Sequence, residues 1–467
     1  MTQKNNRRHF LKASSAVAAA GVTMPYFFSG KPALAFDTDS KNDRVPIALI
    51  GCGGMGTANI KSAKQWLDVV AYADADSGRA EKANKDFSEG KGDVYADYRK
   101  ILERDDIKTV HIATPDHWHT KPLIEAMLAG KDVYCEKPLT LTVDEGKLIR
   151  KVQEETGAVV QVGTQQRSTF NRFVKAIAIV RDGRIGKIKK MTCGIGGAPN
   201  SPEIPVAKVP KELDWDRWLG PAPLADYRAS KDRHRGRSKH SNCHYEFRWW
   251  YEYSGGKLTD WGAHHVDIAA WALVANGQSD AITSVGGEAT HPVEYVDGVP
   301  QQTDRYNTAT KFALNVKFVG DVDVEIQSDA RNGILIEGEK GRLFVSRGKV
   351  DGAPVKELKD NPLPENAIKE TYKGFDPIEN ERKAHWANFL KCVDEKKEPI
   401  SDVHSHLRAL NICHLAGISA RLGREIKWDD KTEQIVGDDV ANSMLKREYR
   451  EGYEIEMKAM EPATANG

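Results

Sequence analysis

The stretch VPIALIGCGGMG, residues 45–56, decides the fold. Its first six residues form a short apolar run that is typical of a buried strand. Residues 51–56 then read Gly-Cys-Gly-Gly-Met-Gly, residues 58–67 have helical periodicity, and residues 69–73 are strand-like again. This order makes a βαβ unit, and in that setting the G-x-G-x-x-G pattern predicts a dinucleotide-binding loop.

Each glycine of the loop has an expected purpose. Gly51 allows a tight turn, Gly53 lets the backbone approach a pyrophosphate, and Gly56 permits close packing of helix on strand. Gly54 and Met55 complete the loop at the helix N-terminus, where free amides and the helix dipole favour an anion. The residues expected to bind cofactor here are Gly51, Gly53, Gly54, Met55 and Gly56.

Asp74 ends the second strand-like run. A carboxylate at this place accepts hydrogen bonds from ribose hydroxyls and repels a 2′-phosphate, which favours NAD over NADP. Asp76 is a rival for this role, and Arg79 leaves phosphate binding open.

The alternation of strands and helices continues to about residue 165. Strand-like runs over 107–113, 133–135 and 159–162 alternate with helical stretches over 121–129 and 143–156. This order predicts a doubly wound parallel sheet of α/β class, a Rossmann domain over residues 44–165.

The later sequence has a different rhythm. Residues 322–326 alternate with period two, and residues 334–336 and 343–345 flank a Gly-Glu-Lys-Gly turn that predicts a hairpin. We expect a C-terminal α+β domain over 166–378 with a largely antiparallel open sheet, helices over 379–430 that pack back on the core, and a C-terminal tail over 431–467. The open sheet could provide an interface between subunits.

The N-terminus carries an export signal. Lys4, Arg7, Arg8 and Lys12 precede an apolar stretch, and Ala33-Leu34-Ala35 is a small-x-small cleavage pattern. The twin arginines with Phe10 and Leu11 indicate a twin-arginine signal peptide over residues 1–35, followed by a linker over 36–43. The alternative is a short membrane anchor. A mature protein without a membrane span, located in the periplasm, is the expectation.

The charge balance is almost neutral, with 68 basic and 67 acidic residues among 467 and a net charge of +1. Such a balance gives no basic field for nucleic acid, so a small, roughly neutral molecule is the expected partner. Six cysteines without a CxxC pattern favour free, mostly buried thiols, and no zinc module is expected.

Five short motifs stand out along the chain. They are TPDHWH at 114–119, AGKDV at 129–133, EKP at 136–138, GGKLTDWGAHHVD at 255–267 and PISDV at 399–403. Together they resemble the motifs of one oxidoreductase family, the Gfo/Idh/MocA oxidoreductases. The resemblance implies a Rossmann domain followed by an α/β domain, often assembled as dimers or tetramers. It also implies a sugar or cyclitol hydroxyl as the group acted upon.

The resemblance also implies roles for single residues. Lys137, Asp260 and His264 take the catalytic positions, and Thr114, Pro115, His119 and Glu136 border the ribose and nicotinamide. Asp116, His117 and Trp118 depart from the commoner asparagine and small residues of the family motif, which leaves the identity of the substrate open.

The spacing of Asp260 and His264 indicates which groups could transfer a proton. Asp260 and His264 are four residues apart, so on one helix they share a face, where the carboxylate would fix the imidazole tautomer and raise its basicity. Lys137 would stabilise a developing alkoxide. A metal site at His264, His265 and Asp267 is the less favoured alternative, because these positions do not all point one way.

Substrate contacts are less defined. The aromatic run at 247–253 is typical of core packing or of a sugar-stacking wall. Arg167, Arg248 and His265 are candidate substrate contacts.

The leading hypothesis is an exported enzyme with tightly bound NAD that transfers hydride to or from a sugar or polyol. The alternatives are an NAD-using glycoside hydrolase and a non-catalytic sugar-binding or cofactor-binding protein.

Overall fold

A computed structural model describes residues 44–234 and 238–455, so the expected signal peptide and linker lie outside the described residues. The first sheet contains six parallel strands in the order β3-β2-β1-β4-β5-β6, which is the order of a Rossmann fold. Its strands are β1 (Val45–Ile50), β2 (Leu67–Ala73), β3 (Asp93–Tyr95), β4 (Thr109–Ile112), β5 (Asp132–Cys135) and β6 (Val160–Val162).

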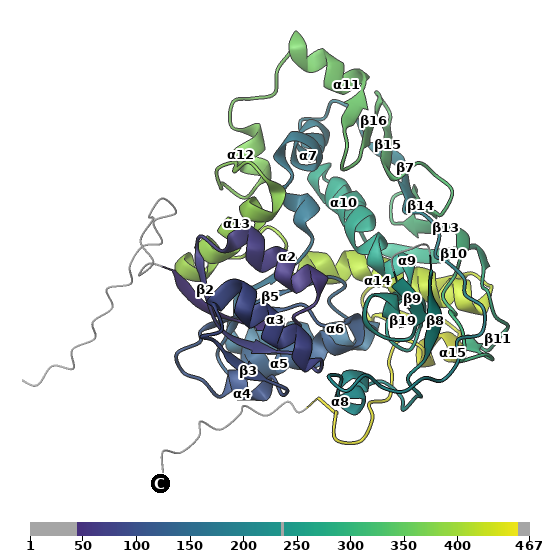
Figure 1. The fold of residues 1–467 in the computed structure, drawn as a ribbon. Helices are drawn as coiled ribbons and strands as arrows, with labels where there is room; N and C mark the ends of the chain where they lie inside the picture. Colours follow the sequence, from purple (N-terminus) through teal and green to yellow (C-terminus); the bar gives the residue numbers. More distant parts are fainter. Residues whose placement is uncertain (1–43, 235–237, 456–467) are drawn as a thin grey trace, which may run out of the picture.

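Helices cover both faces of this sheet (Figure 1). Ile47 and Leu49 of β1 pack in one apolar cluster with α2 (Gly54–Ala63) and α3 (Ser77–Ser88), whereas Ala48 and Ile50 pack in a second with α5 (Thr120–Leu128) and α6 (Val143–Thr156). Alternate residues of a strand point to opposite faces, so the continuous apolar run in β1 reflects burial on both sides. The predicted doubly wound sheet is confirmed.

Two details of the first sheet differ from the prediction. The first helix begins at Gly54, directly after an extended Gly53, rather than at residue 58. The helix α3 and the strand β3 were not predicted, because α3 is mostly polar and buries only Ala80, Ala83 and Asn84, and β3 has three residues.

The second sheet has nine strands and is largely antiparallel, as predicted. Its order is β17-β16-β15-β7-β14-β13-β10-β18-β19, and β7 with β14 is a parallel pair. Residues of β15 (Gly333–Gly338) pair with β16 (Arg342–Val345) as the predicted hairpin. The other strands are β7 (Ile188–Gly194), β10 (Ile282–Thr290), β13 (Lys311–Phe318), β14 (Val322–Gln327), β17 (Val350–Gly352), β18 (Ile426–Asp429) and β19 (Gln434–Ile435).

Long helices connect the two sheets. The helices α10 (Gly262–Ala275) and α14 (Val403–Leu422) pack on the second sheet, and α14 also contacts α6. The helix α13 (Glu381–Glu395) returns to the first sheet, where Trp386 and Phe389 join the cluster around Ile47. The C-terminal helices therefore contact both sheets.

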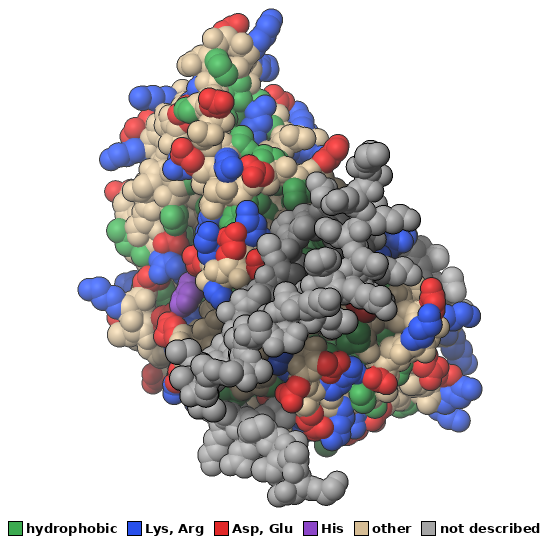
Figure 2. Space-filling model, turned by 90° about the vertical axis from the view of Figure 1, so that its left-hand side faces the viewer, with side chains coloured by type: hydrophobic (Ala, Val, Ile, Leu, Met, Phe, Trp, Pro, Cys, Tyr) green, Lys and Arg blue, Asp and Glu red, His purple; other side chains and the backbone are tan. Residues whose placement is uncertain are grey.

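The surface and the thiols agree with the composition. Figure 2 shows basic and acidic side chains interspersed over the uncovered part of one face, without a large field of one sign. All six cysteines are free and buried, which confirms the prediction. Among residues 44–234 and 238–455, no helix combines the length and apolar character that a membrane crossing needs.

Candidate active site

A cavity of about 470 Å³ lies at the carboxyl ends of the Rossmann strands, where the second domain faces them. The topology of an open parallel sheet favours ligand binding at this edge. The cavity brings together most of the residues expected from the sequence. They are Gly51, Gly53, Gly54, Met55, Asp74, Thr114, Pro115, His119, Glu136, Lys137, Arg248, Asp260 and His264.

The glycine loop fits a pyrophosphate. Gly51 has φ +91°, and a Cβ there would lie 2.5 Å from the carbonyl carbon of Ala113. Gly56 lies behind the loop, where a Cβ would come 2.3 Å from the Gly51 oxygen. No side chain caps the N-terminus of α2. Its first amides therefore remain available to an anion, as the sequence predicts.

Asp74 follows β2 and lies beside the glycine loop. Its carboxylate accepts hydrogen bonds from the backbone N–H of Cys52 at 2.7 Å and of Asp76 at 2.9 Å. Burial raises the pKa of Asp74, and these two N–H groups oppose the shift. Arg79 pairs with Asp76 at 3.3 Å. Asp74 thus keeps a fixed orientation beside the cavity, as a ribose-binding carboxylate requires.

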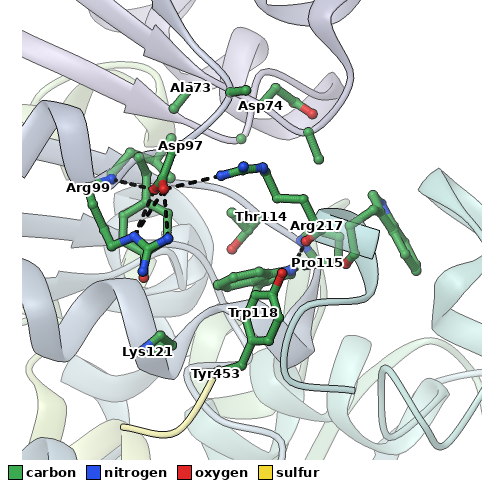
Figure 3. A pocket seen from close by; sticks show the side chains of 16 residues that line it. Ala73, Asp74, Asp97, Arg99, Thr114, Pro115, Trp118, Lys121, Arg217 and Tyr453 are labelled. Atoms are coloured by element: carbon green, nitrogen blue, oxygen red, sulfur yellow. Dashed lines mark hydrogen bonds and ion pairs between the residues drawn. The ribbon is translucent and has the colours of Figure 1, made fainter. Parts of the chain in front are cut away.

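A smaller side cavity of about 110 Å³ adjoins Asp74 and is lined mostly by apolar surface (Figure 3). The rings of Trp118 and Tyr453 meet edge to face, with centroids 5.6 Å apart. Asp97 pairs with both Arg99, at 2.7 Å, and Arg217, at 3.2 Å. Segments distant in sequence therefore enclose this space.

Lys137 joins the two domains inside the main cavity. Its Nζ donates to the Asp260 carboxylate at 2.8 Å and to the Asp260 carbonyl oxygen at 2.9 Å. Arg248 Nε lies 3.5 Å from the same carboxylate. Burial raises the pKa of Asp260, but Lys137 and Arg248 outweigh it, so the pKa stays well below its usual range. The ionised form of Asp260 is therefore favoured, and it holds the ammonium of Lys137 in place.

The expected pair between Asp260 and His264 does not form. The short helix α9 (Lys257–Asp260) ends at Asp260, and α10 begins after Trp261, so the two side chains do not share one helix face. Nδ1 of His264 is buried and has no hydrogen-bond partner among the residues that the structure describes. Burial lowers the pKa of His264 well below its usual value, and Lys137 and Arg347 lower it further. The expected rise in basicity is wrong, because burial and the nearby cations outweigh the effect of Asp260, which by itself raises the pKa of His264.

Two other motif residues are held by their own contacts. Glu136 accepts hydrogen bonds from Asn59 at 2.7 Å and Gln165 at 2.9 Å, and burial raises its pKa. The ring nitrogens of His119 lie 2.6 Å from the carbonyl oxygen of Pro138 and 2.8 Å from that of Thr114. These contacts fix the loops after β4 and β5, and the Lys137–Pro138 bond is cis.

The structure does not bring Arg167 or His265 to this cavity. Arg167 is 4% exposed and makes a two-point ion pair with Asp267, at 2.7 and 2.8 Å. His265 is fully buried, with Nδ1 3.0 Å from the carbonyl oxygen of Gly194. Their polar groups face the interior, which removes them as substrate contacts. No group of three metal-ligating side chains occurs in the part of the chain that the structure describes.

Sequence reasoning missed some residues of the cavity wall, including Asp116, Arg347 and Trp261. Arg347 lies on the turn after β16, with its guanidinium 4.7 Å from the centre of the Trp261 ring. Nothing in the local pattern marks that turn. Asp116, in contrast, was visible as a departure from the family motif. Most of the aromatic run at 247–253 is core, since Trp249, Trp250 and Tyr253 are buried in one cluster, and Phe247 lines the cavity.

Known proteins share these features. The NAD-binding Rossmann-fold domain of the GFO_IDH_MocA oxidoreductase family matches residues 45–164, and the C-terminal α/β domain of that family matches residues 199–455. A twin-arginine translocation signal sequence matches residues 4–24, which indicates export.

Individual relatives are more distant. An α-N-acetylgalactosaminidase of Shewanella oneidensis is 32% identical over 172 residues, which are 32% of this chain and 37% of the relative. An inositol 2-dehydrogenase of Klebsiella pneumoniae is 28% identical over 208 residues, 42% of this chain and 60% of the relative. These matches span less than two thirds of the length of either relative.

A solved structure shows the same fold. A levoglucosan dehydrogenase, in complex with NADH and levoglucosan, aligns with 82% of this chain and 99% of its own, with a TM-score of 0.58 and 20% identity. Since both domain matches together cover most of the residues, this chain belongs to the Gfo/Idh/MocA oxidoreductase family and carries its NAD-binding Rossmann domain.

Proposed function

We propose that the mature protein is an exported enzyme that transfers hydride between a secondary hydroxyl of a sugar or polyol and a tightly held NAD. One observation carries this proposal. The ammonium of Lys137, fixed by Asp260, lies in the same cavity as the glycine loop and Asp74. A cofactor loop and an oriented cation in one cavity are what oxidation of an alcohol requires.

The cofactor would be held along the strand ends. The amides of the glycine loop would bind the pyrophosphate and Asp74 the adenosine ribose, which favours NAD over NADP. The side cavity beside Asp74 is suited to the adenine ring, and Thr114, Pro115, His119 and Glu136 would border the second ribose and the nicotinamide. When bound, the nicotinamide supplies a hydride acceptor or donor.

The chain's own residues would position and polarise the substrate. Lys137 would stabilise negative charge on the reacting oxygen, and Asp260 would keep Lys137 in place. His264, neutral because of its low pKa, would accept a hydrogen bond from the hydroxyl. Arg248 is stacked between Tyr245 and Phe247, at 4.7 and 4.8 Å from their ring centres, and would bind a further hydroxyl.

The direct test combines cofactor analysis with a substrate panel. Mature protein is denatured, and the released nucleotide is identified by mass spectrometry, with about one NAD per chain expected. The native protein is then tested with neutral sugars, uronic acids and cyclitols for reduction of the bound nicotinamide. Absence of nicotinamide in the denatured sample would count against the proposal.

A second candidate is glycoside cleavage through a transient ketone beside the anomeric carbon. It is favoured by the similarity to an α-N-acetylgalactosaminidase and to glycosyl hydrolase family 109 proteins of Shewanella. Release of the free sugar from an aryl glycoside, without net reduced nicotinamide, would select this candidate. Hydride transfer with a free sugar and no glycoside cleavage would select the first.

A third candidate is a non-catalytic binding protein, which would bind a sugar or nucleotide without turnover.

Location in the periplasm is also proposed, on the basis of the twin-arginine signal. We further propose that the open face of the second sheet forms a dimer or tetramer interface, where side chains such as Leu335 and Phe344 are only partly covered. Light scattering on the mature protein tests this assembly.

A further inference from the structure

Arg347 stands on the second-domain side of the main cavity and is exposed, although it lines the cavity. It belongs to the turn between β16 and β17, at the edge of the nine-stranded sheet. The backbone N–H groups of Gly348 and Lys349 donate to Ser346 Oγ at 3.2 and 3.3 Å, so the turn is fixed by its own contacts. A molecule that enters the cavity can therefore reach this guanidinium.

An exposed arginine alone marks no site, but the side chain of Arg347 is held from two sides. Its guanidinium carbon lies 4.7 Å from the centre of the Trp261 ring. In the orientation that satisfies both of its amide atoms, Gln166 accepts from Arg347 Nε at 3.0 Å and donates to the carbonyl oxygen of His264 at 3.2 Å. Gln166 is 1% exposed and gives a firm support. With Nε engaged, the two terminal nitrogens of Arg347 remain to meet a ligand.

Arg347 also lacks a carboxylate partner. In the part of the chain that the structure describes it forms no ion pair, although Glu381, Asp260 and Glu136 act on its charge from a distance. Asp260 and Glu136 are engaged by the donors described above, and Glu381 accepts a hydrogen bond from Thr169 Oγ1 at 2.7 Å. The positive charge of Arg347 is therefore left unmatched.

The other cations of the cavity wall are paired. Arg79 has its own carboxylate at the cofactor end, and Lys137 and Arg248 share the carboxylate of Asp260. Among the described residues, the lysines, arginines and carboxylates that line the cavity from the second domain are Arg248, Asp260 and Arg347. This wall thus carries one positive charge in excess.

The excess charge lies on the substrate side of the cavity. Through Gln166 and Trp261, Arg347 adjoins the start of α10, which carries His264. The glycine loop, where a pyrophosphate would bind, belongs to the other domain. A bound pyrophosphate would therefore not be expected to neutralise Arg347.

We propose that the substrate is an acidic sugar and that Arg347 binds its carboxylate. A guanidinium presents parallel N–H donors that match the two oxygens of a carboxylate, and stacking on an indole fixes its plane. One unmatched positive charge suits one negative charge, such as that of a hexuronate. The reacting hydroxyl would then lie at Lys137 and the carboxylate at Arg347. The inference rests on the proposed function for the claim that this sugar is the substrate, since it names the substrate class of the same site.

Isothermal titration of the mature holoprotein tests the inference. The ligands are D-glucuronate and D-galacturonate, the corresponding uronamides, which have the same size without the charge, and D-glucose 6-sulfate. The preferred uronate is expected to bind about 10-fold to 100-fold more tightly than its uronamide, as for a hydrogen bond to a charged group. The ratio of kcat/KM for hydride transfer from the same two compounds should show the same preference, chiefly through KM.

Variants assign this preference to Arg347. Arg347→Gln is expected to reduce the affinity ratio of uronate to uronamide to about one. Arg347→Lys keeps the charge without the planar fork, so its ratio should fall between the two. Arg342→Gln, on the same hairpin and with a side chain that is 75% exposed, is the matched control and should keep the wild-type ratio. NAD content, measured in each variant, shows whether the cofactor site is intact.

Several results would overturn the inference. They are equal wild-type affinities for uronate and uronamide, a wild-type ratio in Arg347→Gln, tighter binding of the sulfate than of either uronate, and loss of NAD in Arg347→Gln, which would place the side chain at the cofactor. In each case hydride transfer by the wild type would still support the proposed function. Conversely, a wild type that prefers uronates through Arg347 but contains no NAD would support this binding site and refute the proposed function.

Discussion

Lys137 is the point at which the two domains meet in the cavity. The loop after β5 carries it, and within the described residues both of its ammonium hydrogen bonds are to Asp260 of the second domain. Its side chain is 8% exposed, so the ammonium has left most of its hydration and depends on these oxygens. A cation in this state acts strongly on charge that develops beside it.

Replacement of Lys137 by Met is expected to lower kcat by about 100-fold to 10,000-fold, since it removes the positive charge but keeps most of the side-chain volume. Turnover with the panel substrate is the measurement. Lys108 is exposed and directly precedes β4, so Lys108→Met is the control and should retain wild-type turnover. If Lys137→Met keeps wild-type turnover and a normal NAD content, Lys137 is not a catalytic residue.

The pKa of Asp116, which burial raises to about 7, predicts an effect on protein stability, which can be measured without any substrate. The folded state keeps the proton up to about pH 7, whereas the unfolded state loses it near the ordinary value of 3.8. Between these values the folded state binds more protons, so the free energy of unfolding falls as pH rises. Asp116→Asn lacks this loss and should gain on the order of 4 kcal/mol over the wild type above pH 7, and little near pH 4.

Urea denaturation of both proteins at several pH values measures this difference. A difference that stays constant with pH would show that the pKa of Asp116 is not raised in the folded state.

Packing restricts the turn between β1 and α2 at one glycine and leaves another open. A Cβ at Gly51 would overlap the backbone of Ala113, whereas a Cβ at Gly54 would meet nothing within 4 Å. Both glycines belong to the same loop, so they form a matched pair. The difference follows from the close approach of β1 and β4 at this edge of the sheet.

Gly51→Ala is expected to destabilise the protein by roughly 2 kcal/mol or more, because it adds both an overlap and a strained positive φ. Gly54→Ala should change stability by less than about 1 kcal/mol. Denaturation midpoints without added nucleotide provide the measurement. Equal midpoints for the two variants would mean that the loop rearranges freely and is not fixed by Ala113.

The periodicity of the sequence predicted those elements whose structure depends mainly on their own residue pattern. The apolar run of β1 and the amphipathic span of α6, from Val143 to Thr156, appear where the pattern indicates them. The polar α3 and the break at Trp261 were not predicted, since their positions depend on tertiary contacts. The motifs located most of the cavity residues. The partners of Arg167 could not be predicted, because Asp267 lies 100 residues away and the pair forms only when α10 packs beside it.

At the scale of the whole molecule, the end of the described chain returns to the Rossmann domain. Lys121 Nζ donates to the carbonyl oxygen of Glu454 at 2.6 Å. Arg450 pairs with Asp216 at 2.5 Å and donates to the carbonyl oxygen of Gly220 at 2.8 Å. Tyr453 of this C-terminal segment thus lines the side cavity together with Arg217 and Trp218 of the helix α8 (Trp215–Leu219) (Figure 3).

This arrangement predicts how firmly the cofactor is retained. If the adenine ring occupies the side cavity, Tyr453 forms part of the wall beside it, and Arg450 stacks on Tyr453 at 4.5 Å from its ring centre. The double variant Tyr453→Ala, Arg450→Ala removes the ring contact with Trp118 and the ion pair with Asp216. Together these contacts are worth on the order of 1–2 kcal/mol, so NAD should be released about tenfold faster.

The release rate can be followed by trapping freed NAD with an excess of a coupling dehydrogenase and its substrate. Glu451→Ala, an exposed position in the same segment, is the matched control and should release NAD as slowly as the wild type. Equal release rates in all three proteins would show that the contacts of residues 447–455 do not limit the release of NAD. A faster rate only in the double variant would connect tight retention to the chain's C-terminal segment, which would suit an exported enzyme that has little free NAD around it.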